Sequence, residues 1–273
     1  MVIINAILKF FGSLIFVFSL GILIFTLSLV EFTSYNTLQP AITNMFASEI
    51  SKQVDTNQTQ QIRLYLINEC NTTGKENVEL PNFSSPAGGN LTFKCSEIIA
   101  SKPEDLPKII GKQIFDNIYF MNYNCAGALD CFQNLPENQR LQFILSEHFN
   151  KSLNQIVIYS LVAIGVSIVL LAISIRAWYG VAKVVGTSSI FNGLLYFVIP
   201  SIKTIIFEKI PQEGAAGMQP ILELFFNSLN QKLLFVLIAG IILTLLGFVG
   251  SHFAKSKKEN EMKKGKSQKH ESD

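Results

Sequence analysis

The sequence predicts an all-α membrane protein with four transmembrane helices and a mostly helical, disulfide-stapled extracytoplasmic module between the first two spans. Three observations predict this fold. The chain of 273 residues is 49% apolar and 15% charged, which is too hydrophobic for an ordinary soluble domain. Its uncharged apolar runs reach the roughly 20 residues that cross a bilayer as helix. All four cysteines and all five Asn-x-Ser/Thr sequons fall within residues 31–154, between two such runs.

The cysteines and sequons predict the sidedness of the chain. Disulfides and N-linked glycans form on the extracytoplasmic side of a membrane, so residues 31–154 are expected to lie there. The alternative is four reduced, buried cysteines in a chain of inverted topology. The disulfide candidates are Cys70, Cys95, Cys125 and Cys131. The glycosylation candidates are Asn57, Asn71, Asn82, Asn90 and Asn150.

The first span is predicted at residues 10–30, after a short cytoplasmic N-terminus at 1–9. This run of 21 residues carries no charge. A cleaved signal peptide is the rival interpretation. The run exceeds the roughly 7–15 apolar residues of such a peptide, and no Ala-x-Ala site precedes Glu31. We therefore expect a signal anchor.

The second and last spans are predicted at residues 156–175 and 233–253. Arg176 closes the second span, with Trp178 and Tyr179 just beyond it, as is typical of a lipid–water interface. The tail at 254–273 carries seven lysines and four acidic residues. Such basic flanks stay on the cytoplasmic side, and we expect this tail to be disordered.

A weaker apolar segment at residues 190–207 is predicted to be a kinked third span. It contains Asn192, Pro200 and Lys203. If the module lies outside and the tail inside, the chain must cross once more between the second and last spans. The crossing leaves a cytoplasmic loop at 176–189 and an extracytoplasmic loop with an amphipathic helix at 208–231. Three spans with a re-entrant segment at 190–207 is the alternative.

Within the module, helical spacing of apolar residues predicts helices over Leu38–Leu66 and Glu104–Phe120. A further helix begins near Pro136 and leads into the second span. Asn71–Gly89 is rich in Asn, Ser, Pro and Gly, which indicates a loop. Four cysteines allow three connectivities. The spacing favours two local pairs, Cys70–Cys95 and Cys125–Cys131.

The sequence contains no recognisable catalytic constellation, and we expect neither a cofactor nor a metal. The three histidines, His148, His252 and His270, have no metal-ligand spacing between them. Asn192, Pro200 and Lys203 are the intramembrane polar or helix-breaking candidates, and Lys203 is the one charge inside a predicted span. Small residues allow close helix packing in membranes. The helix-packing candidates are Gly165, Gly240, Gly247 and Gly250.

A long outer loop between the first two of four spans resembles the architecture of claudins and, with the loops exchanged, of tetraspanins. The claudin loop carries a Trp-based motif ahead of paired cysteines, whereas the single tryptophan here is Trp178, on the predicted inner side. The tetraspanin Cys-Cys-Gly sequence is absent. The resemblance is therefore one of architecture, and neither family is assigned.

The leading hypothesis is a non-enzymatic surface protein that binds, adheres to or organises partners through its outer module. The alternative is a subunit of a membrane transport or assembly complex that uses the Pro200–Lys203 region. A membrane-embedded enzyme is the third hypothesis. The expected partners are the lipid bilayer and other proteins, or self-association through the spans or the module, with no nucleic acid.

Overall fold

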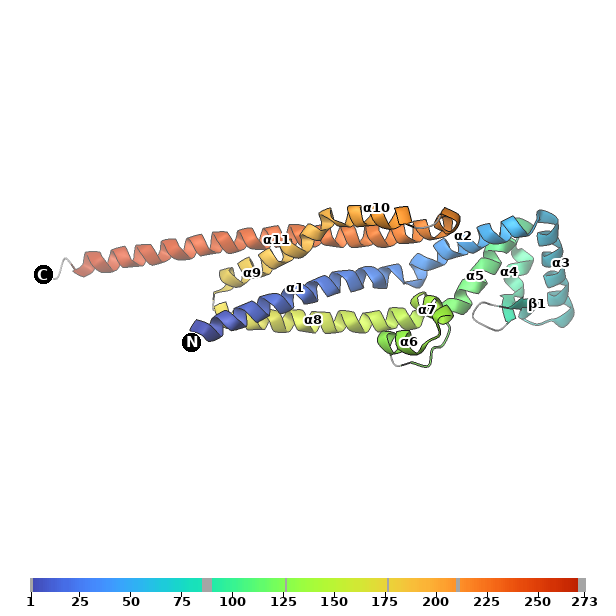
Figure 1. Ribbon diagram of the computed structural model, residues 1–273, viewed down its shortest axis with the longest axis horizontal. Coiled ribbons are helices and arrows are strands. Elements are labelled where there is room, and N and C mark those ends of the chain that lie inside the picture. Colours follow the sequence, from blue (N-terminus) through green and yellow to red (C-terminus); the bar gives the residue numbers. More distant parts are fainter. Residues whose placement is uncertain (1, 85–89, 126, 176, 210–211, 270–273) are drawn as a thin grey trace. The chain divides into compact units, whose positions relative to one another are not determined.

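A computed structural model describes residues 2–84, 90–125, 127–175, 177–209 and 212–269 (Figure 1). The chain divides into two compact units. We call the first the span unit; it contains residues 1–28, 156–209 and 226–273. We call the second the module unit; it contains residues 29–155 and 210–225.

Four helices are long and apolar enough to cross a membrane, as the sequence predicts. These candidate spans are Ile3–Phe32, Glu147–Ile175, Trp178–Glu208 and Leu222–Lys255. The helices that carry them are α1 (Val2–Phe32), α8 (Glu147–Ile175), α9 (Trp178–Gly193) with η2 (Leu194–Phe197) and α10 (Ile199–Lys209), and α11 (Gln212–Lys269).

The segment at 176–189, predicted to be a loop, is helical from Trp178 onward. Helix α9 therefore begins 12 residues before Ile190, where the third span was predicted. The reason is the composition of this stretch, in which Lys183 is the one charged residue. Gly186 packs closely against α11, and this tertiary packing outweighs its low helix propensity.

The segments at 208–231 and 254–273 also differ from the predictions. Helix α10 ends at Lys209 and α11 begins at Gln212, so the predicted amphipathic helix is the first part of α11. The tail predicted to be disordered continues α11 to Lys269. Lys, Glu, Gln and Met are favourable helix formers, and a helix already nucleated by a span extends through them readily.

The module unit contains most of the short elements of the chain. The predicted helix over Leu38–Leu66 is two helices, which break at Val54 and Asp55. Asp55 begins the second of them with a capping box, in which its carboxylate accepts from the Gln58 N–H at 2.7 Å. The elements are α2 (Tyr35–Gln53), α3 (Thr56–Thr73), β1 (Asn77–Ser84), β2 (Asn90–Lys94), α4 (Cys95–Ala100), η1 (Pro103–Asp105), α5 (Leu106–Tyr119), α6 (Ala128–Asn134) and α7 (Glu137–Ile144).

An antiparallel hairpin occupies part of the segment predicted to be a loop at Asn71–Gly89. Val78 pairs with Phe93 and Leu80 with Leu91, and all four side chains are buried. The alternation Val-x-Leu and Leu-x-Phe is the period of two that marks a strand with one buried face. The alternation is short and is flanked by turn-forming residues, so the sequence did not predict strands here. The all-α prediction is therefore incomplete by one two-stranded sheet.

The largest core of the module unit lies between α3, the hairpin, α4 and α5. Leu66, Leu91, Phe93, Ile98 and Leu106 are almost fully buried in it. Helices α2 and α5 pack against each other beside this core. A Cβ atom at Gly111 would lie 2.9 Å from the Thr43 carbonyl oxygen. The close approach of the two helices therefore depends on glycine at this position.

Candidate functional site

Helices α9 and α11 of the span unit meet closely at predicted packing glycines, in a contact that we call the seam. A Cβ atom at Gly240 would lie 2.7 Å from the Ile190 backbone nitrogen, and one at Gly247 would lie 2.8 Å from that of Lys183. At Gly250 it would meet the Trp178 ring at 2.9 Å. Gly165 differs, because a Cβ there would have open space. Three of the four predicted glycines thus lie on one seam.

Two glycines of α9 contribute to the same seam and escaped the sequence analysis. A Cβ atom at Gly186 would lie 2.8 Å from the Gly240 carbonyl oxygen, and one at Gly193 would lie 2.6 Å from the Leu237 Cα atom. Gly186 was assigned to a loop, where glycine carries no packing information. The seven-residue step between the two α9 glycines matches the step from Gly240 to Gly247 and is the signal that would have found them.

Lys183 is a charged residue inside a candidate span that the sequence analysis missed. Its Nζ atom donates a hydrogen bond to the Ser251 Oγ atom at 2.8 Å and lies 4.2 Å from the centre of the Phe248 ring. A hydrogen bond and a cation–π contact both compensate an ammonium group for lost water. Lys183 therefore joins the first turns of α9 to α11, and its contacts are those of a structural residue.

Asn192 is buried at the point where α9 ends. Its Nδ2 atom donates to the Val17 carbonyl oxygen of α1 and to the Ser188 carbonyl oxygen, both at 3.2 Å. One turn earlier, the Ser13 and Ser188 hydroxyls lie 3.4 Å apart. A Cβ atom at Gly21 would come within 3.0 Å of the Asn192 Oδ1 atom. Polar side chains and glycine thus join α1 to α9, a common arrangement inside membranes.

The third candidate span is interrupted directly after Asn192. The 3₁₀ segment η2 separates α9 from α10, and Pro200 stands at the second position of α10. The kink predicted from Pro200 therefore coincides with a break in helical geometry. Lys203 lies one turn further on, half-buried, with its Nζ atom 5.6 Å from the centre of the Phe207 ring. The hydrogen bonds of Asn192 go to α1 and to α9.

Both predicted cysteine pairs are joined in the module unit. The Cys70–Cys95 pairing is confirmed, with a Cα–Cα distance of 5.6 Å, and both cysteines are buried in the largest core. Cys125 and Cys131 are bonded with a Cα–Cα distance of 5.2 Å. Cys131 is fully buried, whereas Cys125 is partly exposed. The second pair belongs to a separate aromatic core with Tyr123, Phe143 and Phe149.

His148 lies beside the second cysteine pair, although the sequence separates them by 17 residues or more. The two sulfur atoms and an imidazole nitrogen all lie within 4.8 Å of one another. The His148 ring contacts the rings of Tyr123 and Phe143, with centroid distances of 6.4 and 6.0 Å. The sequence analysis missed this group because α7 and the turn before α8 bring His148 back to the cysteines, and no spacing rule encodes that return.

Tyr123 in the same core has a buried hydroxyl group that lacks a hydrogen-bond partner among the described residues. Burial raises the pKa of Tyr123 to about 12, because the phenolate would lose its water. Buried hydroxyl groups are usually paired. The aromatic core therefore contains a buried hydroxyl group without a hydrogen-bond partner among the described residues.

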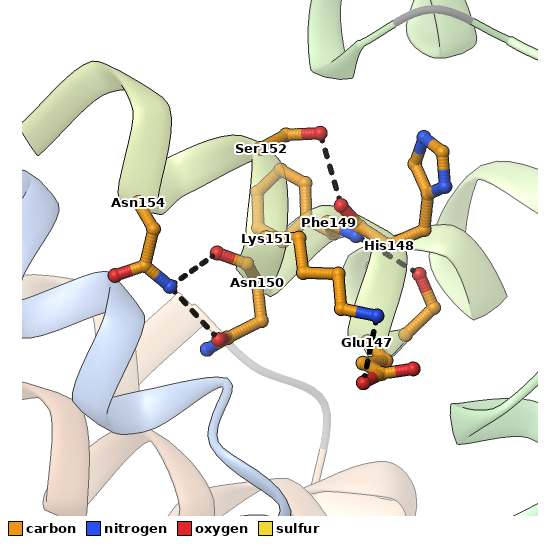
Figure 2. A network of polar contacts seen from close by, with 8 residues as sticks. Glu147, His148, Phe149, Asn150, Lys151, Ser152 and Asn154 are labelled. Atoms are coloured by element: carbon orange, nitrogen blue, oxygen red, sulfur yellow. Dashed lines mark hydrogen bonds and ion pairs between the residues drawn. The ribbon is translucent and has the colours of Figure 1, made fainter. Parts of the chain in front are cut away.

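Asn150 heads a sequon, yet its side-chain amide is engaged in the structure. The Nδ2 atom donates to the Val30 carbonyl oxygen at 2.8 Å and to the Thr33 Oγ1 atom at 2.9 Å. Figure 2 shows this first turn of α8, where the Asn154 amide donates to Asn150 and Lys151 pairs with Glu147 at 2.9 Å. Asn150 is therefore built into the contact between α8 and the end of α1. A glycan would modify the same Nδ2 atom that makes this contact.

The other sequons have different settings. Asn57 and Asn71 are exposed, at the first turn and the last turn of α3. Asn82 and Asn90 lie in the hairpin, and their side chains are outside the described part of the structure. Of the five candidates, Asn57 and Asn71 therefore have described side chains that are open to modification.

Comparison with protein-family models, with curated proteins and with solved structures finds no match to this chain. The function therefore has to be argued from the geometry. The described side chains offer two kinds of arrangement. Glycine seams and buried polar bonds hold the span unit together, while disulfides and an aromatic core with a histidine stabilise the module unit.

Proposed function

We propose that this chain is a non-enzymatic integral membrane protein that binds or organises partner proteins through its module unit. The observation that carries the proposal is that residues 29–155 form most of a compact unit with its own apolar cores and cysteine pairs. A unit with its own core holds its surface side chains in fixed positions, as a binding surface requires. In the spans, Lys183 and Asn192 are engaged in helix–helix contacts, and several hydroxyl groups bond to carbonyl oxygens of their own helix, which favours the module unit as the recognition element.

We infer that the module unit faces the extracytoplasmic side and that both termini are cytoplasmic. The sequons, the cysteines and the lysine-rich tail support this orientation. A membrane-impermeant thiol reagent tests it on intact cells. Labelling of the four cysteines is expected from outside and after reduction. Labelling from the cytoplasmic side without reductant contradicts the orientation.

The partner-binding proposal is tested by site-specific crosslinking in native membranes. Leu64 on α3 is 55% exposed although it is apolar, so a photo-reactive residue there samples the module surface. The matched control is the same photo-reactive residue at Leu246, which is 51% exposed on α11 and lies within a candidate span. We expect a defined protein adduct from position 64 that is absent from position 246. The purified adduct partner should then bind the purified chain directly.

Two results together contradict this proposal. One is that positions on α3 yield no protein adduct in native membranes. The other is that the chain purifies alone and monomeric from mild detergent. A protein adduct from position 246 without one from position 64 assigns the partner contact to the spans.

The break in the third span favours a second candidate, a transport or assembly subunit. Discontinuous helices expose backbone carbonyl groups and helix ends inside a membrane, and transporters use them to bind substrates and ions. Pro200 and Lys203 lie directly after such a break. The test is Lys203→Leu in reconstituted vesicles, with Lys232→Leu as a charge-matched control outside this segment. Transport that survives the first change eliminates this candidate.

A further inference from the structure

The aromatic core around Cys125 and Cys131 contains the ligand set of a metal site. We propose that in its dithiol form this cysteine pair binds one zinc ion together with His148, so that the module unit carries a redox-controlled metal site. Two thiols and one imidazole are the ligand types that zinc prefers. Their ligand atoms already lie within 4.8 Å of one another. The surroundings of the other cysteine pair differ, because the described buried residues packed around Cys70 and Cys95 are aliphatic side chains and Phe93.

Burial makes charge balance the deciding physical condition. Cys131 is fully buried and Tyr123 is 8% exposed, whereas Cys125 and His148 are partly exposed, so net charge is costly on the inner side of this site. Two thiolates compensate the two positive charges of zinc, and a neutral histidine adds none. A site of three histidines would leave the core with a double positive charge. The set present here is therefore electrically matched to its surroundings.

The position of His148 is held by aromatic packing. Its ring packs against the edge of the pair formed by Tyr123 and Phe143, whose own centroids lie 5.2 Å apart, and this packing limits the rotation of the side chain. A zinc ion with three protein ligands keeps a fourth position for water or another ligand. The Tyr123 hydroxyl, which is buried and has no hydrogen-bond partner among the described residues, belongs to the same aromatic core.

The exchange between the two forms balances with a dithiol as the reductant. The dithiol gives two electrons and two protons to the Cys125–Cys131 bond and itself becomes a disulfide. The sulfur–sulfur bond breaks, and each cysteine becomes a thiol. Zinc then displaces one proton from each thiol and takes the lone pair of the neutral His148 ring, with no change in its own oxidation state. Oxidation of the two cysteines by an external disulfide reverses the sequence and releases the ion.

The test uses the full chain in detergent, reduced with a phosphine that is then removed under anaerobic conditions. Zinc or cobalt is added and the excess is removed. We expect one bound metal per chain and, with cobalt, the absorption of thiolate-to-metal charge transfer. The oxidised chain should bind none. The Cys70→Ser, Cys95→Ser double variant should retain the metal, whereas Cys125→Ser, Cys131→Ser should lose it.

His148→Gln separates a three-ligand site from two thiols that bind zinc without it. We expect this variant to lose at least about tenfold in zinc affinity. Affinity equal to that of the unaltered chain overturns the proposal. A measurement on the unaltered chain guards against misfolded variants, because zinc should slow alkylation of Cys125 and Cys131 but not that of Cys70 and Cys95. Equal alkylation rates with and without zinc also overturn it.

Discussion

The module unit and the span unit are held together by different forces. In the module unit, large apolar side chains such as Phe93, Phe115 and Phe143 are almost completely buried, and covalent bonds join distant segments. Among the candidate spans, at most 28% of the residues in the apolar 18-residue window are buried, and close helix contacts occur at glycines of the span unit. Water drives apolar side chains inward, whereas lipid does not, so helices in lipid associate through close packing and polar bonds.

The largest effect that this comparison predicts is the loss of the Cys70–Cys95 bond. A closed loop of 25 residues stabilises a fold by about 3.5 kcal/mol through chain entropy, against about 2.2 kcal/mol for a loop of 6. We therefore expect Cys70→Ser with Cys95→Ser to destabilise the module unit more than Cys125→Ser with Cys131→Ser. Amide hydrogen exchange of the full chain in detergent measures both variants.

The same measurement checks the independence of the two units. Exchange should accelerate in α3 and α5 and stay unchanged along the seam of α9 and α11. If α9 and α11 exchange faster to the same extent, the two units unfold as one and the comparison fails.

The seam itself is tested by adding one methyl group. Gly240→Ala places a Cβ atom 2.7 Å from the Ile190 backbone nitrogen, so the helices must separate. We expect a loss of about 1–3 kcal/mol. Gly165→Ala is the matched control, because its Cβ atom meets open space and alanine favours a helix. Thermal unfolding in one detergent compares them, and equal melting temperatures would contradict the role of the seam.

How far the sequence predicts this molecule depends on the range of each signal. Uncharged runs are local, so the four long apolar helices were predictable, and so was the nearby pairing of Cys70 with Cys95. Lys183 and Gly186 were missed because their meaning depends on α11, about 60 residues later. His148 was missed for the same reason, since it reaches the cysteines only after the chain folds back.

The hairpin was missed for a different reason. Among the strand residues whose burial is described, two are buried in each strand, Val78 and Leu80 in one and Leu91 and Phe93 in the other. An alternation this short is weak beside a segment rich in Asn, Ser, Pro and Gly. The buried faces become evident only when they meet α3 and α5 in the core.

Two asparagines that join helices, the buried Asn192 and the partly buried Asn150, allow the same substitution to be compared in the two units. Asn150 donates two side-chain hydrogen bonds to the end of α1 in the module unit, and Asn192 donates one to α1 in the span unit. We expect Asn150→Ala to cost about 1–3 kcal/mol, because it removes two hydrogen bonds and takes this donor from the Val30 carbonyl, while the Thr33 hydroxyl keeps its bond to the Leu29 carbonyl oxygen. Asn192→Ala should cost about 0.6 kcal/mol, the average for such bonds between membrane helices.

Denaturant unfolding of the two variants, each in the full chain, measures the difference. A larger loss for Asn192→Ala than for Asn150→Ala reverses the expected order. Asn150→Ala also tests the sequon, because the loss of a glycan at this position would lower the apparent mass of the chain. We expect no such shift, since the amide is already engaged.

The last predicted effect is a pH dependence of the stability of the module unit. The Tyr35 hydroxyl donates to the Asp116 carboxylate at 2.7 Å, and burial together with this carboxylate raises the pKa of Tyr35 to about 12. The ordinary pKa of tyrosine is about 10, so the folded state holds this proton more tightly than the unfolded state. Its contribution is therefore complete below pH 10 and is lost as the pH rises toward 12.

Tyr35→Phe should remove about 1 kcal/mol at neutral pH, as expected for one partly buried hydrogen bond. It should also flatten the fall in module stability between pH 10 and 12. Tyr123, whose pKa burial alone raises to about 12, still titrates in the variant, so a shallower fall should remain. Exchange rates of α2 and α5 as a function of pH distinguish the two tyrosines. An unchanged slope in Tyr35→Phe would assign the alkaline effect to Tyr119 and Tyr123, whose pKa values are also raised by burial.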